Sequence, residues 1–137
     1  MGIKKIPDDQ IVFYQTPEGS INIEVLYADE NIWLPQKRIA ELFNTTKQNI
    51  SLHLNNIFKI KELDKNSVVK DFLTTANDGK KYKTKFYSLE AIIAVGYRVN
   101  SDRGTQFRQW ATGILKNYIR KGYALDVNRM KHGSRFS

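Results

Sequence analysis

The stretch that decides the fold is residues 36–58, QKRIAELFNTTKQNISLHLNNIF. Its apolar residues follow helical spacing on both sides of Asn44. A helix-turn-helix needs a small residue where the helices cross, a turn residue that tolerates positive φ, and an apolar residue that locks the second helix. Ala40, Asn44 and Ile50 meet these three needs in order. The stretch therefore predicts a helix-turn-helix, and a plain helical hairpin packed on a sheet is the alternative.

The second helix of this pair is predicted to carry a polar outward face. Asn and Gln side chains can bond bidentately to adenine, Lys can reach guanine or phosphate, and Ser and Thr suit either. Leu52 lies off the apolar stripe, and no feature of the pattern explains it. The candidate nucleic-acid-binding residues here are Thr45, Lys47, Gln48, Asn49, Ser51 and Asn55, with His53 at the margin.

Strands are expected on both sides of the helical pair. Three β-prone segments separated by turn residues predict an antiparallel meander over residues 11–14, 21–27 and 32–34. In the second of these, Ile21, Ile23, Val25 and Tyr27 alternate with Asn22, Glu24 and Leu26, a period of two residues that is typical of a strand. Beyond the pair, residues 70–75 and 81–87 predict a β-hairpin across the turn Asn77-Asp78-Gly79.

Two helices are expected to close the chain. Ser88 is placed to cap a short helix, and a break near residues 99–101 precedes a longer helix that ends at Lys121-Gly122. The predicted fold class is α+β: a small antiparallel sheet with an embedded helix-turn-helix, a basic β-hairpin and a C-terminal pair of helices. We expect residues 1–10 to form a tail, 11–125 a single domain, and 126–137 a polar tail or the start of a further region.

Lysines occupy one face of the second hairpin strand. Lys81, Lys83 and Lys85 alternate with Tyr82, Thr84 and Phe86, and three lysines cannot face an apolar core. They predict a wing that lies along the DNA backbone. The alternatives are a solvated sheet face or an edge strand that lysine protects from aggregation.

Three arginines, Arg98, Arg103 and Arg108, surround the start of the last helix. Arginines beside a helix N-terminus favour an anion, so a DNA phosphate is a candidate ligand there. The alternative is structural, with Asp102 pairing with one arginine and the arginine stems covering the core.

Composition narrows the function classes. The chain has 137 residues, no Cys, two His and a net charge of +8. Without Cys there is no thiolate metal site, disulfide or Cys nucleophile, and no catalytic motif stands out. We therefore expect a protein that is not an enzyme and that uses no metal or cofactor. No apolar stretch is long enough to span a bilayer and no signal segment opens the chain, so a cytoplasmic location without membrane contact is expected.

The positive charge is unevenly distributed. Residues 1–79 carry 9 basic and 11 acidic residues, whereas residues 80–137 carry 13 basic and 3 acidic ones. The predicted electrostatic footprint therefore draws mainly on the second half of the chain.

Several long strings resemble the RhuM family of bacterial and phage proteins. They are IWLPQK at 32–37, IAELF at 39–43, TANDGK at 75–80, YSLEAIIAVGYRVNS at 87–101 and RGTQFRQWA at 103–111. The likeness covers roughly residues 10–132, and the second half also resembles, more loosely, Bro-N and KilA-N type domains. The resemblance implies a DNA-binding protein of mobile elements, in some members with a virulence label. It also implies that this chain corresponds to the N-terminal domain of longer members.

These observations predict a double-stranded DNA-binding protein, a sequence-specific regulator of a bacterial or phage mobile element. Besides double-stranded DNA, a second copy of the chain is a candidate partner, which would make the protein a homodimer. The alternative function is a protein–protein interaction or oligomerisation module, in which Trp110, Ile114 and Tyr118 of the last helix would meet a partner. The competing interpretation of that stripe is that it forms part of the domain's own core.

Overall fold

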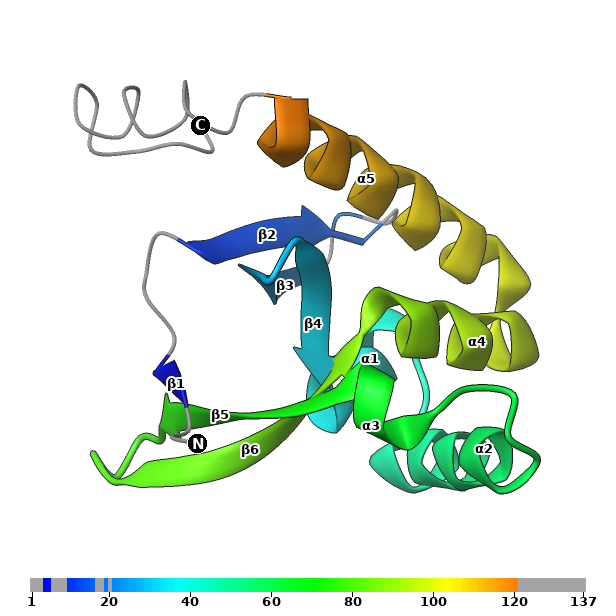
Figure 1. The fold of residues 1–137 in the computed structure, drawn as a ribbon, viewed down its shortest axis with the longest axis horizontal. Helices are drawn as coiled ribbons and strands as arrows, with labels where there is room; N and C mark the ends of the chain where they lie inside the picture. Colours follow the sequence, from blue (N-terminus) through cyan, green and yellow to red (C-terminus); the bar gives the residue numbers. More distant parts are fainter. Residues whose placement is uncertain (1–3, 6–9, 17–18, 20, 121–137) are drawn as a thin grey trace.

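The structure is a computed structural model that describes residues 4–5, 10–16, 19 and 21–120. Within these residues the chain forms six strands and five helices (Figure 1). In chain order they are β1 Lys4–Lys5, β2 Ile11–Gln15, β3 Asn22–Ala28, β4 Asn31–Pro35, α1 Gln36–Leu42, α2 Lys47–Lys59, α3 Lys65–Val68, β5 Val69–Thr75, β6 Lys81–Ser88, α4 Leu89–Val99 and α5 Ser101–Arg120. The predicted α+β class is confirmed.

All the described strands join one sheet, in the order β1-β5-β6-β4-β3-β2. The predicted meander, β2 to β4, and the predicted hairpin, β5 and β6, are both antiparallel. Antiparallel pairing of β4 with β6 joins these two parts, and Leu34 lies opposite Tyr87 there. Figure 1 shows β4 running from β2 and β3 at one end to the hairpin at the other. The sequence predicted the two parts but not the pairing that unites them.

The main core lies between the sheet and the helices. Alternation puts Ile23 and Val25 of β3 and Ile32 and Leu34 of β4 on the helix-facing side, where all four are fully buried. α1, α4 and α5 contact the sheet, and α2 packs on α1 and α4. The packing of α2 on other helices, away from the sheet, keeps one of its faces open.

The opposite face of the sheet carries a second, smaller apolar cluster. Leu26 packs there with Trp33, Phe72 and Phe86, and the two phenylalanine rings are 5.2 Å apart. The predicted alternation does place Leu26 opposite Ile23 and Val25, but the alternation did not indicate that Leu26 is buried there, where it is only 2% exposed. An alternation of apolar and polar residues is expected where one face of a sheet is in contact with water. Here apolar residues from β3, β4, β5 and β6 pack together on both faces of the sheet, so both faces are partly buried.

Two glycines allow α4 and α5 to approach closely. A Cβ atom added at Gly96 would lie 2.6 Å from Cζ of Phe43 and 3.2 Å from Cα of Gly104. Phe43 is the C-cap of α1 and only 2% exposed, so its ring cannot move aside easily. The Phe43 ring, at the end of α1, therefore packs directly on Gly96 of α4.

Some predicted features lie outside the described residues. They are Pro17, Glu18 and Ser20 of the first turn, the helix end at Lys121-Gly122, the side chains of Tyr118 and Ile119, and most of the two expected tails. Ser88 occupies the N-cap position of α4 as predicted, although its side chain makes no capping hydrogen bond.

Candidate nucleic-acid interface

The turn between α1 and α2 is held by backbone and side-chain hydrogen bonds. Asn44 has φ of +54°, the left-handed conformation that Asn tolerates better than most residues. The Thr45 N–H then donates to the Ala40 carbonyl at 2.9 Å. Thr46 is the N-cap of α2, and its hydroxyl accepts from the Asn49 N–H at 3.1 Å. Local sequence therefore fixes both the end of α1 and the start of α2.

One face of α2 anchors the helix. Ile50, Leu54 and Ile57 are at most 2% exposed and belong to the main core. Ala40 of α1 is also buried, at 7%, and α1 packs against α2; the crossing of the two helices at Ala40 stays a prediction. Because three consecutive turns are anchored, the opposite face of α2 is held in a fixed position.

The opposite face of α2 is open. Gln48, Leu52, Asn55 and Lys59 follow one another at steps of four, three and four residues, and all four are exposed. Lys47 at the first position of the helix is exposed as well. The face thus combines amide groups, amino groups and one apolar side chain, and it has no acidic residue.

The remaining candidates on this helix are more constrained. The Asn49 side chain donates to the Thr45 hydroxyl at 3.0 Å, so these two predicted residues bond to each other. Ser51 and His53 are half-buried at the margins of the outward face. The sequence predicted base contacts for both Asn49 and Gln48. In the structure the Asn49 amide bonds to Thr45, whereas the Gln48 side chain is exposed.

The lysines of β6 lie on a projecting part of the hairpin. β4 pairs only with residues 86–88 of β6, so Lys81, Lys83 and Lys85 have strand partners in β5 alone. All three lysines are exposed, and Lys85 lies 4.0 Å from the Asp71 carboxylate on β5. This geometry fits a wing and also fits a lysine-protected edge.

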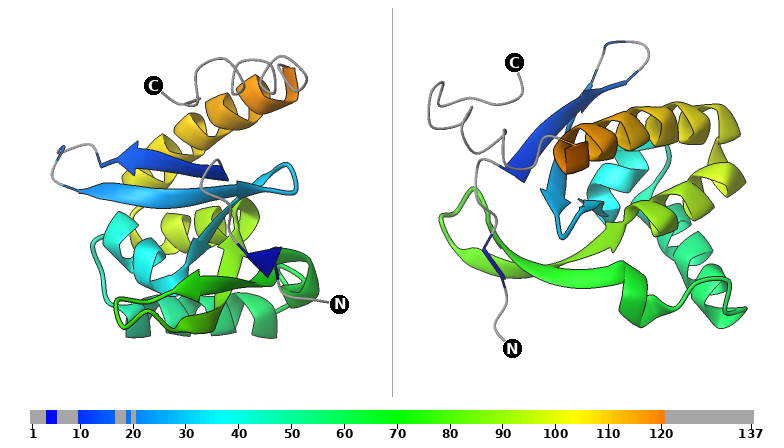
Figure 2. Two further views of the ribbon diagram at one scale, coloured as in Figure 1. Left: turned by 90° about the vertical axis from the view of Figure 1, so that its left-hand side faces the viewer. Right: turned by 45° about the horizontal axis from the view of Figure 1, so that its top comes forward.

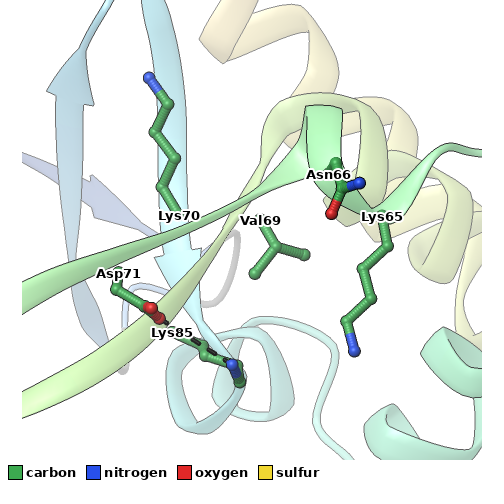
Figure 3. A pocket seen from close by; sticks show the side chains of 6 residues that line it. All are labelled: Lys65, Asn66, Val69, Lys70, Asp71 and Lys85. Carbon is green, nitrogen blue, oxygen red and sulfur yellow. Dashed lines mark ion pairs between the residues drawn. The ribbon is translucent and has the colours of Figure 1, made fainter. Parts of the chain in front are cut away.

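A polar pocket of about 210 Å³ lies at the base of the hairpin. Its lining residues come from α3, β5 and β6: Lys65, Asn66, Val69, Lys70, Asp71 and Lys85. In Figure 3 the Lys65 and Lys85 side chains extend to the same side, whereas Lys70 points the other way. Lys70 pairs with Asp29 and its amino group lies 5.2 Å from the Trp33 ring centroid.

Sequence reasoning missed Lys65 as a neighbour of the hairpin lysines. It lies in α3, a helix of four residues that is too short for the hydrophobic periodicity to predict. It also precedes Lys85 by 20 residues in the sequence. Only the folded hairpin brings the two amino groups to one pocket. An N-cap aspartate, Asp64, was the available signal for α3, because its side chain accepts from the Asn66 N–H.

α2 and the hairpin lie along the same side of the molecule, with α2 on the right and the hairpin tip on the left in Figure 1. In Figure 1 both are at the bottom of the view, away from β2 and α5. The turned view on the left of Figure 2 again places both at the bottom. These two elements, which are far apart in the sequence, therefore belong to one side of the fold.

The three predicted anion-binding arginines contact groups of the chain itself. The Arg98 guanidinium lies 2.6 Å from the Glu62 carboxylate, and Arg108 Nε donates to the Tyr97 hydroxyl at 3.1 Å. Arg103 donates to the Leu42 carbonyl at 2.7 Å, at the end of α1. These contacts give the arginines structural roles, and the predicted phosphate contacts of Arg103 and Arg108 stay predictions.

One comparison with known proteins finds a match. Residues 67–137, 71 of the 137 residues, match the sequence model of the virulence protein RhuM family. The chain belongs to the RhuM family. The match begins in α3 and includes the β5–β6 hairpin, α4 and α5, whereas α1 and α2 precede it. No curated protein and no solved structure matches the chain.

RhuM membership confirms the family that the sequence strings indicated. The family description carries a virulence label and names no ligand, so the interface stands on this chain's own geometry. Among the residues that the structure describes, no group of three or more His, Cys, Asp or Glu lies close enough together to hold a metal ion. No helix within the described part of this RhuM chain is long and apolar enough to cross a membrane.

Proposed function

We propose that this RhuM family chain is a sequence-specific double-stranded DNA-binding protein, a regulator of a bacterial or phage mobile element. α2 enters the major groove, and the β5–β6 hairpin lies along the phosphate backbone. The observation that carries the proposal is that α2, which has an open acid-free face, and the hairpin, which has a projecting strand of lysines, lie along one side of the fold.

The outward face of α2 has the size and chemistry for base reading. A helix of 13 residues is about 20 Å long, and the major groove of about 12 Å admits a helix with its side chains. Gln48 and Asn55 present exposed amides that can donate to and accept from adenine. Lys47 and Ser51, at the start of the helix, meet guanine or the flanking phosphates.

The hairpin supplies the sequence-independent part of the affinity. Lys81, Lys83 and Lys85 are point charges on flexible stems, which suits contact with a phosphate backbone better than base reading. Lys65 extends the basic strip from the hairpin to α3 beside the pocket. We assign Arg103 and Arg108 secondary phosphate roles, because their guanidinium groups already make internal hydrogen bonds.

The alternative, a protein-interaction module, has less support. Trp110 packs against Tyr14 with ring centroids 4.9 Å apart, and Ile114 packs against the main core. These two residues of the predicted stripe therefore contribute to the chain's own core. We further propose that the chain is not an enzyme and requires no cofactor; a homodimer on DNA remains part of the proposal, without an assigned interface.

Duplex binding tests the function directly. The chain should retard a random-sequence duplex at about 50 mM salt and bind it more weakly at about 200 mM, because released counterions drive the contact. Repeated selection from a random duplex pool should then return a shared base pattern. A single-stranded oligonucleotide of the same length is the control for non-specific charge attraction.

Two results would contradict the proposal at different levels. Absence of retardation at about 50 mM salt would exclude duplex DNA as the ligand. Retardation without any shared pattern after selection would leave a DNA-binding protein that does not read sequence.

A further inference from the structure

Leu52 is the one apolar side chain on the outward face of α2. It is 58% exposed, and Gln48 and Asn55 lie on either side of it along the same face. The core face of the helix is complete without it, because Ile50, Leu54 and Ile57 are already buried. Its position at the centre of a polar face is therefore not explained by folding.

The neighbours of Leu52 indicate what it meets. Gln48 and Asn55 carry the amide group that bonds bidentately to adenine in the major groove. Every adenine is paired with thymine, and the thymine C5-methyl group is the apolar feature that the major groove offers. A leucine between two amides that bind adenine therefore lies opposite A·T pairs. Its apolar side chain can pack against the thymine methyl group of such a pair.

We infer that Leu52 is a specificity-determining residue that packs against a thymine methyl group in the bound duplex. The inference rests on the proposed function and adds to it: the target site contains A·T pairs, and one thymine is read by apolar contact. Ile60 provides a contrast, because it is 65% exposed but follows the end of α2 and lies off the line of Gln48, Leu52 and Asn55.

Thymine-to-uracil replacement isolates the methyl group. Deoxyuridine keeps the O4 acceptor and the base pair and lacks only the C5-methyl. A duplex selected by the chain from a random pool is made with each thymidine replaced in turn. At one thymine in each bound site we expect binding to weaken about fourfold, the loss of one buried methyl group.

Variants of the chain assign that methyl group to Leu52. Leu52→Ala should bind the thymidine and deoxyuridine duplexes equally, because the contact is already absent. Leu52→Met keeps an apolar side chain of similar volume and should retain most of the discrimination. Ile60→Ala, the matched control for an exposed apolar residue, should discriminate as the unaltered chain does. Leu52 is exposed, so all these proteins should unfold at nearly the same temperature.

Each other outcome overturns the inference in a distinguishable way. If no replacement weakens binding to a selected duplex, or if Leu52→Ala still discriminates, sequence reading stands and the role of Leu52 does not. If light scattering shows that Leu52→Ala converts a dimer into a monomer, Leu52 belongs to a subunit contact. If the unaltered chain binds no duplex at low salt, the proposed function itself fails, and the inference with it.

Discussion

α2 and the β5–β6 hairpin differ in how firmly the fold holds them. α2 is anchored by three buried residues over three turns and rests on α1 and α4. The outer part of β6, residues 81–85, has β5 as its strand partner and extends past the end of its pairing with β4. The two elements lie along one side of the molecule, yet one is supported by the core and the other projects.

The difference matches what each element is proposed to do. Base reading requires amide groups held in fixed directions, so a helix that reads bases needs a core behind it. Phosphate contact by lysine requires only a positive charge within reach, which a projecting strand supplies. The residue types agree: α2 presents Gln48 and Asn55, whereas β6 presents Lys81, Lys83 and Lys85.

The largest effect is expected from removing an anchor of α2. Ile50 is fully buried, so Ile50→Ala should lower the free energy of unfolding by about 2–5 kcal/mol through lost burial and a cavity. Leu52→Ala, two residues away on the open face, should change it by less than about 0.5 kcal/mol. Urea denaturation of both variants measures the contrast, and similar losses would mean that α2 is not anchored as the structure indicates.

The anchoring of α2 was largely readable from sequence, because it depends on local rules. Helical spacing identified Ile50, Leu54 and Ile57, and the tolerance of Asn for positive φ identified the turn at Asn44. Both features are decided within a few residues of chain. Periodicity also located the meander and the hairpin, whose strand ends differ from the predicted bounds by at most one residue.

Three features that the sequence did not predict depend on distant parts of the chain. The burial of Leu26 requires Trp33, Phe72 and Phe86 to gather on the second face of the sheet. The proximity of Lys65 to Lys85 requires the hairpin and α3 to meet at the pocket. The hydrogen bond from Arg103 to the Leu42 carbonyl spans 61 residues. The cluster around Leu26 depends on the β4–β6 pairing, and the other two contacts depend on where the helices pack; no local pattern encodes either.

The hairpin side of the comparison is tested by charge removal. Changing Lys81, Lys83 and Lys85 together to Ala should weaken binding to every duplex and flatten the dependence of log affinity on log salt, by up to about 0.9 per lost contact. Lys116→Ala removes an exposed lysine from α5 and serves as the control. An unchanged slope in the triple variant would leave the hairpin as a lysine-protected edge with no role in binding.

A smaller effect separates two amides that the sequence ranked together. Gln48→Ala should reduce discrimination at one adenine position by about 1–3 kcal/mol, while binding to random duplexes stays nearly the same. Asn49→Ala removes the hydrogen bond to Thr45 and should lower thermal stability slightly, with little change in base preference. Selection experiments with both variants measure the difference. A stronger change in base preference for Asn49→Ala would reverse the assignment.

The smallest effect concerns the hairpin tip. The Tyr82 hydroxyl donates to the Asp78 carboxylate at 2.7 Å, the Lys80 N–H donates to its other oxygen at 2.9 Å, and together they lower the pKa of Asp78. The folded tip therefore favours the charged carboxylate. Its contribution to stability is present above the ordinary pKa of an aspartate and is lost as the pH falls through the lowered value.

A titration followed by NMR on the Asp78 carboxyl carbon tests this arrangement. Tyr82→Phe removes the hydroxyl, the larger of the two causes, so the pKa should rise toward its ordinary value and remain slightly low because of the Lys80 N–H. If the pKa of Asp78 in the unaltered chain has its ordinary value, the tip does not hold this geometry in solution. The turn at the hairpin tip would then lack the two hydrogen bonds to Asp78 in solution. The contrast between a helix anchored in the core and a loosely held basic strand would be larger than the structure implies.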